Sequence, residues 1–172
     1  MKGLIVYDSL YGNTEKIAHA IGEALGNREE CMVMRVGNVK PDQFASLDLL
    51  ISGSPTQRFQ PTPAMNNLLK EIPQNSLKGV KVTAFDTRLT EEWIHKTPVL
   101  AFFVRVSGRS AYAAKSMADK LKKKGGELIT SPEGFYVEGT EGPLVQGELE
   151  RAASWAKKIG LVMQTIPTQR RS

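Results

Sequence analysis

Short apolar runs alternate along this chain with segments whose apolar residues recur at helical spacing. The runs at residues 2–8, 30–36, 47–53 and 80–87, and a fifth that begins at 127–130, are typical of buried strands. Helical spacing is found at residues 14–26, 63–72, 110–124 and 147–163. Apolar strands separated by amphipathic helices indicate a parallel sheet covered on both faces, so we expect a three-layer α/β fold. We place this single domain at residues 1–165 and a C-terminal tail at residues 166–172.

The composition fits a soluble globular protein in a reducing compartment. The chain has 172 residues, of which 41% are hydrophobic and 24% are charged. Its longest apolar stretch, residues 98–104, is far shorter than the roughly 20 residues of a membrane-spanning helix. The single Cys31 cannot form an intrachain disulfide, and the first strand begins so early that we expect no signal peptide. These features lead us to expect a cytoplasmic location and no membrane span.

The charge of the chain predicts partners with acidic surfaces. The formal net charge is +5 at pH 7 and the pI is about 9.4. Lysines cluster at residues 120–124, but no aromatic side chains are interleaved with them. We therefore expect a solvated helix end there and no nucleic-acid surface.

The first loop at the carboxyl edge of the predicted sheet is suited to an anion. Ligands of this architecture bind outside the carboxyl ends of the strands, which selects residues 9–14, 54–62 and 86–97. The first loop, Ser9, Leu10, Tyr11, Gly12, Asn13 and Thr14, leads into a helix whose first N–H groups are unpaired. It has neither the lysine of a P-loop nor the G-x-G-x-x-G of a dinucleotide-binding turn. It therefore predicts a single terminal phosphate held by neutral donors.

The second and third loops offer polar donors and aromatic side chains. The second contains Ser54, Pro55, Thr56, Gln57, Arg58 and Phe59, and the third contains Asp86, Thr87 and Arg88, followed by Trp93. Beside a phosphate site, such loops suit a flat ring that is attached to the phosphate. Phe59 and Trp93 could equally pack on the protein surface.

Two motifs resemble those of the flavodoxin family. Ser9-x-Tyr11-Gly12-Asn13-Thr14 is similar to the family's [ST]-x-[TS]-G-x-T phosphate motif, and Gly53-Ser54-Pro55-Thr56 is similar to the start of its second flavin loop. The resemblance extends over nearly the whole chain, including residues 134–137 and the last helix. It implies a five-stranded parallel sheet of order 2-1-3-4-5, for which flavodoxin with FMN is itself the standard example. It also implies an electron carrier that shuttles electrons between redox partner proteins. Noncovalent FMN would place its phosphate on residues 9–14 and its ring between residues 56–59 and 86–88.

Three features depart from the family pattern. Tyr11 replaces a small Ser or Thr, which would remove or relocate one hydroxyl donor to the phosphate. No glycine stands at residues 56–58, where the family has a peptide that flips its carbonyl toward the flavin, so we expect weaker stabilisation of one-electron-reduced flavin. Arg58 and Arg88 border the expected ring, where a cation would raise the reduction potential and attract acidic partners. Alternatively, both arginines point to solvent or pair with Asp86 or Glu91.

Two other functions stay open from the sequence. One is an FMN-dependent reductase of quinones or similar small acceptors, which would need an open pocket over the ring. The other is a flavin-free interaction module on a flavodoxin fold. The apolar segment 98–104 either packs beneath the last strands or forms an exposed surface for a homodimer or a partner. We predict no catalytic residue and no metal site, because we can place no second ligand or nucleophile beside His19 or His95.

Overall fold

Strands and helices alternate in the computed structural model, which describes residues 1–26, 30–96, 98–107 and 112–165. The elements are, in chain order, β1 (Gly3–Tyr7), α1 (Asn13–Leu25), β2 (Cys31–Arg35), η1 (Val36–Asn38), η2 (Pro41–Phe44), β3 (Leu49–Pro55), α2 (Pro63–Glu71), β4 (Lys81–Leu89), α3 (Glu91–His95), α4 (Pro98–Ser107), α5 (Ala113–Lys123), β5 (Glu127–Leu128), β6 (Glu133–Val137) and α6 (Glu148–Thr165). The predicted tail, residues 166–172, lies outside the described residues, as do the first two residues of the helix predicted at 110–124.

The strands form one parallel sheet whose order is β2-β1-β3-β4-β5, with β6 also paired to β4. Ile5 of β1 pairs with Val33 of β2 and with Ile51 of β3. All five residues of β1 are buried, as expected for a strand that is covered on both faces. The predicted strand order is confirmed.

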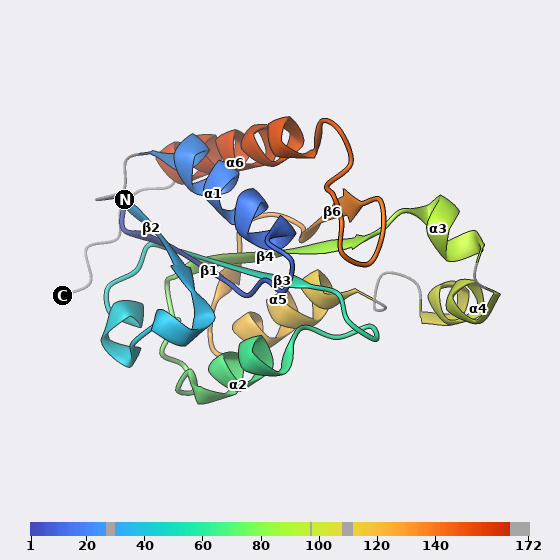
Figure 1. Ribbon diagram of the computed structural model, residues 1–172. Helices are drawn as coiled ribbons and strands as arrows, with labels where there is room; N and C mark the ends of the chain where they lie inside the picture. Colours follow the sequence, from blue (N-terminus) through green and yellow to red (C-terminus); the bar gives the residue numbers. More distant parts are fainter. Residues whose placement is uncertain (27–29, 97, 108–111, 166–172) are drawn as a thin grey trace.

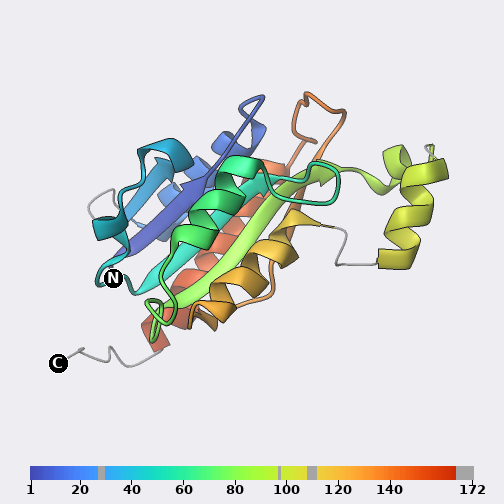
Figure 2. The ribbon, with the colours of Figure 1, turned by 90° about the horizontal axis from the view of Figure 1, so that it is seen from below.

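Helices cover both faces of the sheet, so the fold has the predicted three layers. In Figure 1 and Figure 2, α1 and α6 lie together on one face, and α2 and α5 lie on the other. Ile17 of α1 and Ile159 of α6 belong to the core of the first face. Met65 of α2 and Leu121 of α5 belong to the core of the second.

The fifth strand is divided, which the sequence did not predict. β5 pairs with Lys81 and Val82, whereas β6 pairs with β4 from Phe85 to Leu89. Between the two pieces stands Pro132, whose nitrogen cannot donate a ladder hydrogen bond. The divided strand therefore reaches the carboxyl edge of the sheet at Val137, the last residue of β6, and a fourth loop begins after it.

Two helices, α3 and α4, project beyond the edge of the sheet and form what we call the α3–α4 arm, residues 91–96 and 98–107 (Figure 1, Figure 2). Val99 of α4 is 67% exposed and Phe102 is 63% exposed. For these two side chains, the structure supports an exposed position and not packing beneath the last strands. None of the described helices combines the length and apolar character needed to cross a membrane.

Candidate functional site

A pocket opens at the carboxyl edge of the sheet, where the three predicted loops meet the fourth loop. Its walls carry Ser9, Leu10, Tyr11, Asn13 and Thr14 from the first loop, Pro55, Thr56 and Gln57 from the second, Thr87, Arg88 and Leu89 from the third, and Val137 and Thr140 from the fourth. Gly12, Ser54, Arg58, Phe59 and Asp86 were also predicted as site residues, but they are not part of these walls. The fold therefore brings loops that are far apart in sequence to one cavity.

The N-terminus of α1 points its unpaired N–H groups toward the first loop. The helix begins at Asn13, and its N-cap residue, Gly12, provides no side-chain cap. Gly12 has φ 81°, while an added Cβ would meet no atom within 4 Å. Glycine is thus favoured here by the left-handed backbone and not by lack of space. The helix dipole adds partial positive charge, which favours an anion.

Ser9 contributes a hydroxyl that the protein leaves unused. Its Oγ is buried and has no hydrogen-bond partner among the described residues. Leaving a buried donor unsatisfied costs about 1–3 kcal/mol, so a ligand that accepts from it gains correspondingly. Leu10 and Tyr11, by contrast, are 50% and 53% exposed and form the outer wall. The donor set of the first loop is neutral and fits a phosphate group carried by a ligand.

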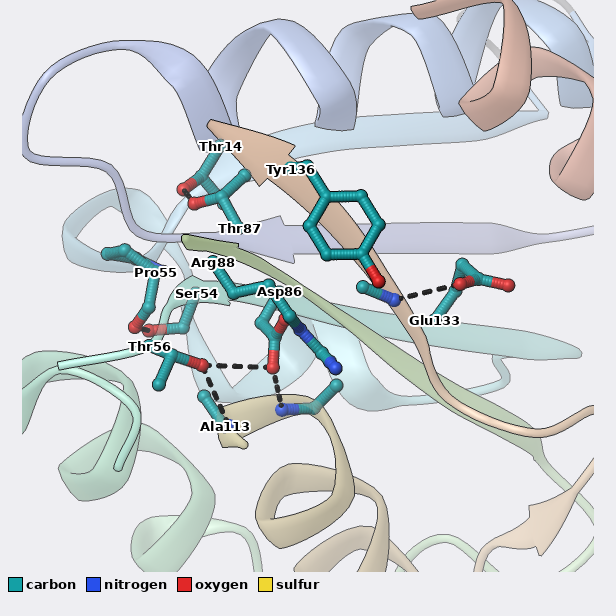
Figure 3. Close-up of polar contacts among 12 residues, drawn as sticks. Thr14, Ser54, Pro55, Thr56, Asp86, Thr87, Arg88, Ala113, Glu133 and Tyr136 are labelled. Atoms are coloured by element: carbon teal, nitrogen blue, oxygen red, sulfur yellow. Dashed lines mark hydrogen bonds and ion pairs between the residues drawn. The ribbon is translucent and has the colours of Figure 1, made fainter. Parts of the chain in front are cut away.

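Two side chains in the first turn of α1 hold the pocket together. The Thr14 and Thr87 hydroxyls are hydrogen-bonded at 2.8 Å, which joins α1 to the end of β4 (Figure 3). Asn13 Nδ2 donates to the Glu141 carbonyl at 2.9 Å, which joins α1 to the fourth loop. Glycine is favoured at residue 142 by its φ of 106°, and an added Cβ would also lie 2.4 Å from Asn13 Nδ2 and displace that amide. The Asn13 amide nitrogen is therefore hydrogen-bonded to the protein and is not directed to a ligand.

The second loop is a tight hairpin with unusual backbone angles. The Gln57 N–H donates to the Gln60 carbonyl at 2.9 Å, and the Gln60 N–H donates to the Gln57 carbonyl at 2.8 Å. The two central residues, Arg58 and Phe59, have φ of 45° and 66°. Such a turn normally contains glycine, asparagine or aspartate, because other side chains are strained at positive φ. The structure thus adopts positive φ in a segment that contains no glycine. Ser54 lies beneath the loop, where its Oγ accepts from the Thr62 N–H at 3.0 Å.

Asp86 has a structural role beneath the pocket. Its carboxylate is fully buried and accepts from Arg88 Nε at 2.6 Å, from the Ala114 N–H at 2.8 Å and from Thr56 Oγ1 at 3.0 Å. Thr56 Oγ1 in turn accepts from the Ala113 N–H at 3.0 Å, so both side chains cap α5 (Figure 3). Burial raises the pKa of the Asp86 carboxyl, and the charge and hydrogen bonds of its partners partly offset that rise.

Arg88, at the edge of the pocket, is a cation whose charge is balanced by an ion pair. Besides its ion pair with Asp86, its Cζ lies 3.7 Å from the centroid of the Tyr112 ring. It also lies against Gly134, where a Cβ would be 2.2 Å from the same carbon. For Arg88 the structure therefore supports the expected alternative of pairing with Asp86. Arg58 is exposed at the tip of the hairpin.

The fourth loop is the part of the pocket that sequence reasoning missed. Because the sequence places the fifth strand near residues 127–130, it predicts no loop after Val137 at this edge. The turn residues Gly139, Gly142 and Pro143 follow an apolar run and would have indicated a loop at the same edge. Trp93 and His95, which we did consider, belong to α3 and lie outside this pocket.

Comparisons with known proteins identify the fold. A flavodoxin from the domain Archaea is 19% identical, with a TM-score of 0.69 over 95% of this chain and 99% of that chain. Oxidised flavodoxin 1 from Bacillus cereus is 15% identical, with a TM-score of 0.68 over 92% of this chain and 97% of that chain. A WrbA-like flavodoxin from Agrobacterium tumefaciens is 18% identical, with a TM-score of 0.66 over 95% of this chain and 97% of that chain. At such identities these likenesses establish the fold alone.

No curated protein gives a significant match. The sequence profile of the family described as flavodoxin, however, matches residues 5–155, which is most of the chain. Together with the strand order and the pocket at the carboxyl edge, this match shows that the chain belongs to the flavodoxin family.

Proposed function

We propose that this protein binds FMN noncovalently in the carboxyl-edge pocket and carries electrons between redox partner proteins. The observation that carries the proposal is the buried Ser9 hydroxyl, which has no partner among the described residues and lies in the loop before the uncapped N-terminus of α1. A phosphate oxygen accepts hydrogen bonds from both kinds of donor. Membership of a flavin-binding family supports the same assignment.

Different residues of the pocket would bind different parts of the cofactor. Ser9 and the first N–H groups of α1 would bind the phosphate, while Thr56, Gln57 and Thr87 would border the ring. FMN supplies the redox chemistry when it is bound. Asp86 would act from beneath the wall, because it fixes Arg88 and α5 in place. The chain thus contributes binding, shape and electrostatics.

The charge of the chain favours acidic redox partners. Opposite charges steer partners toward one another, and salt screens this attraction. With a net charge of +5, the protein should transfer electrons to an acidic partner more slowly as ionic strength rises. We place the protein in the cytoplasm, in keeping with its single, buried cysteine.

A second pocket favours an alternative function, an FMN-dependent reductase of quinones or similar small acceptors. It lies between α3 and α4 and is lined by Glu91, Ile94, His95, Pro98, Ala101, Phe102, Arg105 and Tyr112. Tyr112 stacks on Arg88, which is part of the first pocket, so the two cavities are neighbours. A small apolar acceptor bound there would be close to a flavin in the first pocket.

Titration of the purified protein with FMN tests the proposal, with absorption and fluorescence as readouts. The variant Ser9→Ala should bind FMN about 5–10-fold more weakly, because one hydrogen bond contributes about 1 kcal/mol. Ser52→Ala is the matched control, since Ser52 Oγ is also buried without a partner among the described residues but lies away from the pocket walls. Its FMN affinity should equal that of the wild type.

Three outcomes separate the candidate functions. A wild-type protein that does not bind FMN would contradict the proposal and leave the flavin-free interaction module. Equal affinities of Ser9→Ala and Ser52→Ala would show that the phosphate is held elsewhere. Steady turnover of the FMN-loaded protein with a nicotinamide cofactor and a quinone would identify the reductase instead of the carrier.

A further inference from the structure

One side of α4 carries exposed apolar side chains, and Phe102 on this side also borders the second pocket. Val99, Phe102 and Val106, which we call the α4 apolar face, are 67%, 63% and 69% exposed. The helix belongs to the arm that projects from the sheet edge, so neither helical layer of the domain covers this face (Figure 2). Single exposed apolar residues are common on proteins, but three on one short helix form a patch that favours an interaction.

The spacing of the three residues is self-complementary. Positions i, i+3 and i+7 lie on one stripe of a helix. The stripe is almost symmetric about Phe102, which lies near its centre. A second α4 running in the opposite direction would therefore place Phe102 against its own copy, and Val99 against the partner's Val106. Antiparallel helices also oppose their dipoles favourably.

The charges of the arm favour a second copy over a charged partner. Glu91 and Glu92 balance Lys96 and Arg105 within its described residues, although the whole chain carries +5. Acidic proteins and anionic membranes would be attracted to the basic surfaces elsewhere on the chain and not to this neutral arm. Two neutral arms, in contrast, can approach without repulsion between them.

The available area is smaller than that of a stable specific interface, so the dimer should be weak and reversible. With about 150 Å² of surface for each side chain, the α4 apolar face exposes about 300 Å² per copy and about 600 Å² in a pair. A specific interface requires about 1,000 Å². Pro98 and the stem of Arg105, which also line the second pocket, are exposed beside the same stripe and can supply part of the remainder.

We propose that the α4 apolar face is a self-association surface, through which two copies of the chain form a dimer of two-fold symmetry. In such an isologous interface the same face of both copies is used, so Val99 of each copy contacts Val106 of the other, and the two Phe102 side chains contact each other. The proposal goes beyond electron transfer and does not depend on FMN. Because the arm extends away from the domain, the dimer leaves the carboxyl-edge pocket open.

Sedimentation equilibrium of the full chain tests the dimer. The mean mass should rise from 18.9 kDa toward twice that value with increasing concentration, both with and without FMN. Phe102→Asp should hold the mass at the monomer value. Leu161→Asp is the matched control, because Leu161 on α6 is also 63% exposed and should leave the dimer intact. Circular dichroism confirms that both variants remain folded.

Cross-linking tests the symmetry of the pair. Phe102→Cys should form a disulfide-linked dimer under mild oxidation, whereas Leu161→Cys should not, and buried Cys31 should not compete. A wild type that is monomeric at every concentration would overturn the proposal. So would a dimer that Phe102→Asp does not weaken. Binding of the monomer to neutral phosphatidylcholine vesicles, abolished by Phe102→Asp, would assign the face to lipid and also overturn it.

Discussion

Replacing Asp86 with alanine should destabilise the protein strongly. The substitution removes the buried acceptor of Arg88, and it removes the acceptor of the Ala114 N–H at the start of α5. Only 16% of the Arg88 side chain is exposed, so water can replace the lost carboxylate only in part. The guanidinium would then keep its stack on Tyr112 but have no counter-ion at its Nε.

The expected loss follows from these two effects. Removing one partner of a buried ion pair costs about 3–5 kcal/mol, and the partial exposure of Arg88 favours the lower value. Loss of a helix cap costs about 1 kcal/mol. The free energy of unfolding should therefore fall by about 3–4 kcal/mol, which corresponds to a decrease in Tm of roughly 10 °C for a chain of this size.

Urea unfolding followed by circular dichroism measures the change. Asp119→Ala is the control, because Asp119 forms an exposed i,i+4 pair with Lys115 at 2.8 Å and has 48% of its side chain exposed. Such pairs contribute about 0.5 kcal/mol or less. Adding Arg88→Met to Asp86→Ala should recover part of the stability, because the unpaired cation is then removed. A loss at Asp86 no larger than at Asp119, or no recovery in the double variant, would refute the reasoning.

Three further predictions concern single residues. Burial and the hydrogen bond to Glu15 raise the pKa of Tyr7 to about 12. The contribution of Tyr7 to stability is therefore complete below pH 10 and is lost as the pH rises toward 12. In urea unfolding, the wild type should lose more stability over this pH range than Tyr7→Phe. Gly12→Ala should cost about 1 kcal/mol because φ is 81°, whereas Gly37→Ala, with equally open surroundings and no positive φ, should cost nothing by the same assay. Arg58→Gly should raise the free energy of unfolding by about 0.5–1 kcal/mol by relieving φ of 45°, and a loss of stability would show that the side chain holds the hairpin.

The sheet and its first loop could be predicted because local sequence determines them. A buried parallel strand reads as a continuous apolar run, and β1, with Leu4, Ile5 and Val6 at its centre, is one. The uncapped start of α1 follows from Gly12, a residue that cannot cap a helix with its side chain. The order of the strands depended on the family resemblance, since the strand segments alone do not determine which strands are neighbours.

The second loop and the divided strand depend on tertiary structure. Nothing in Arg58 and Phe59 favours positive φ, so the hydrogen bonds between Gln57 and Gln60 must outweigh their local preference. The division of the fifth strand changes which residues reach the carboxyl edge, and thereby brings Thr140 into the pocket. Pro132 marks the break between β5 and β6 in the sequence, whereas the local preferences of Arg58 and Phe59 do not indicate the positive φ of the hairpin.

The placement of charge in the pocket follows from a simple rule that the sequence already contained. Successive residues of a strand point to opposite faces, so Asp86 and Arg88 share one face of β4 and Thr87 points to the other. The structure shows Asp86 bonded to α5 on one side and Thr87 bonded to Thr14 of α1 on the other. The ionic pair is thus directed toward α5, and the side that faces α1 receives a neutral hydroxyl. On the α1 side of β4, a phosphate would meet a hydroxyl and not the Arg88 cation, whereas Arg35 is a cation beside the first loop: its Nη2 donates to the Ser9 carbonyl at 2.9 Å, and its Nε lies 3.8 Å from the Asp8 carboxylate. Because Asp8 already balances the charge of Arg35, the affinity for the phosphate should depend on salt less than the association with acidic partners does.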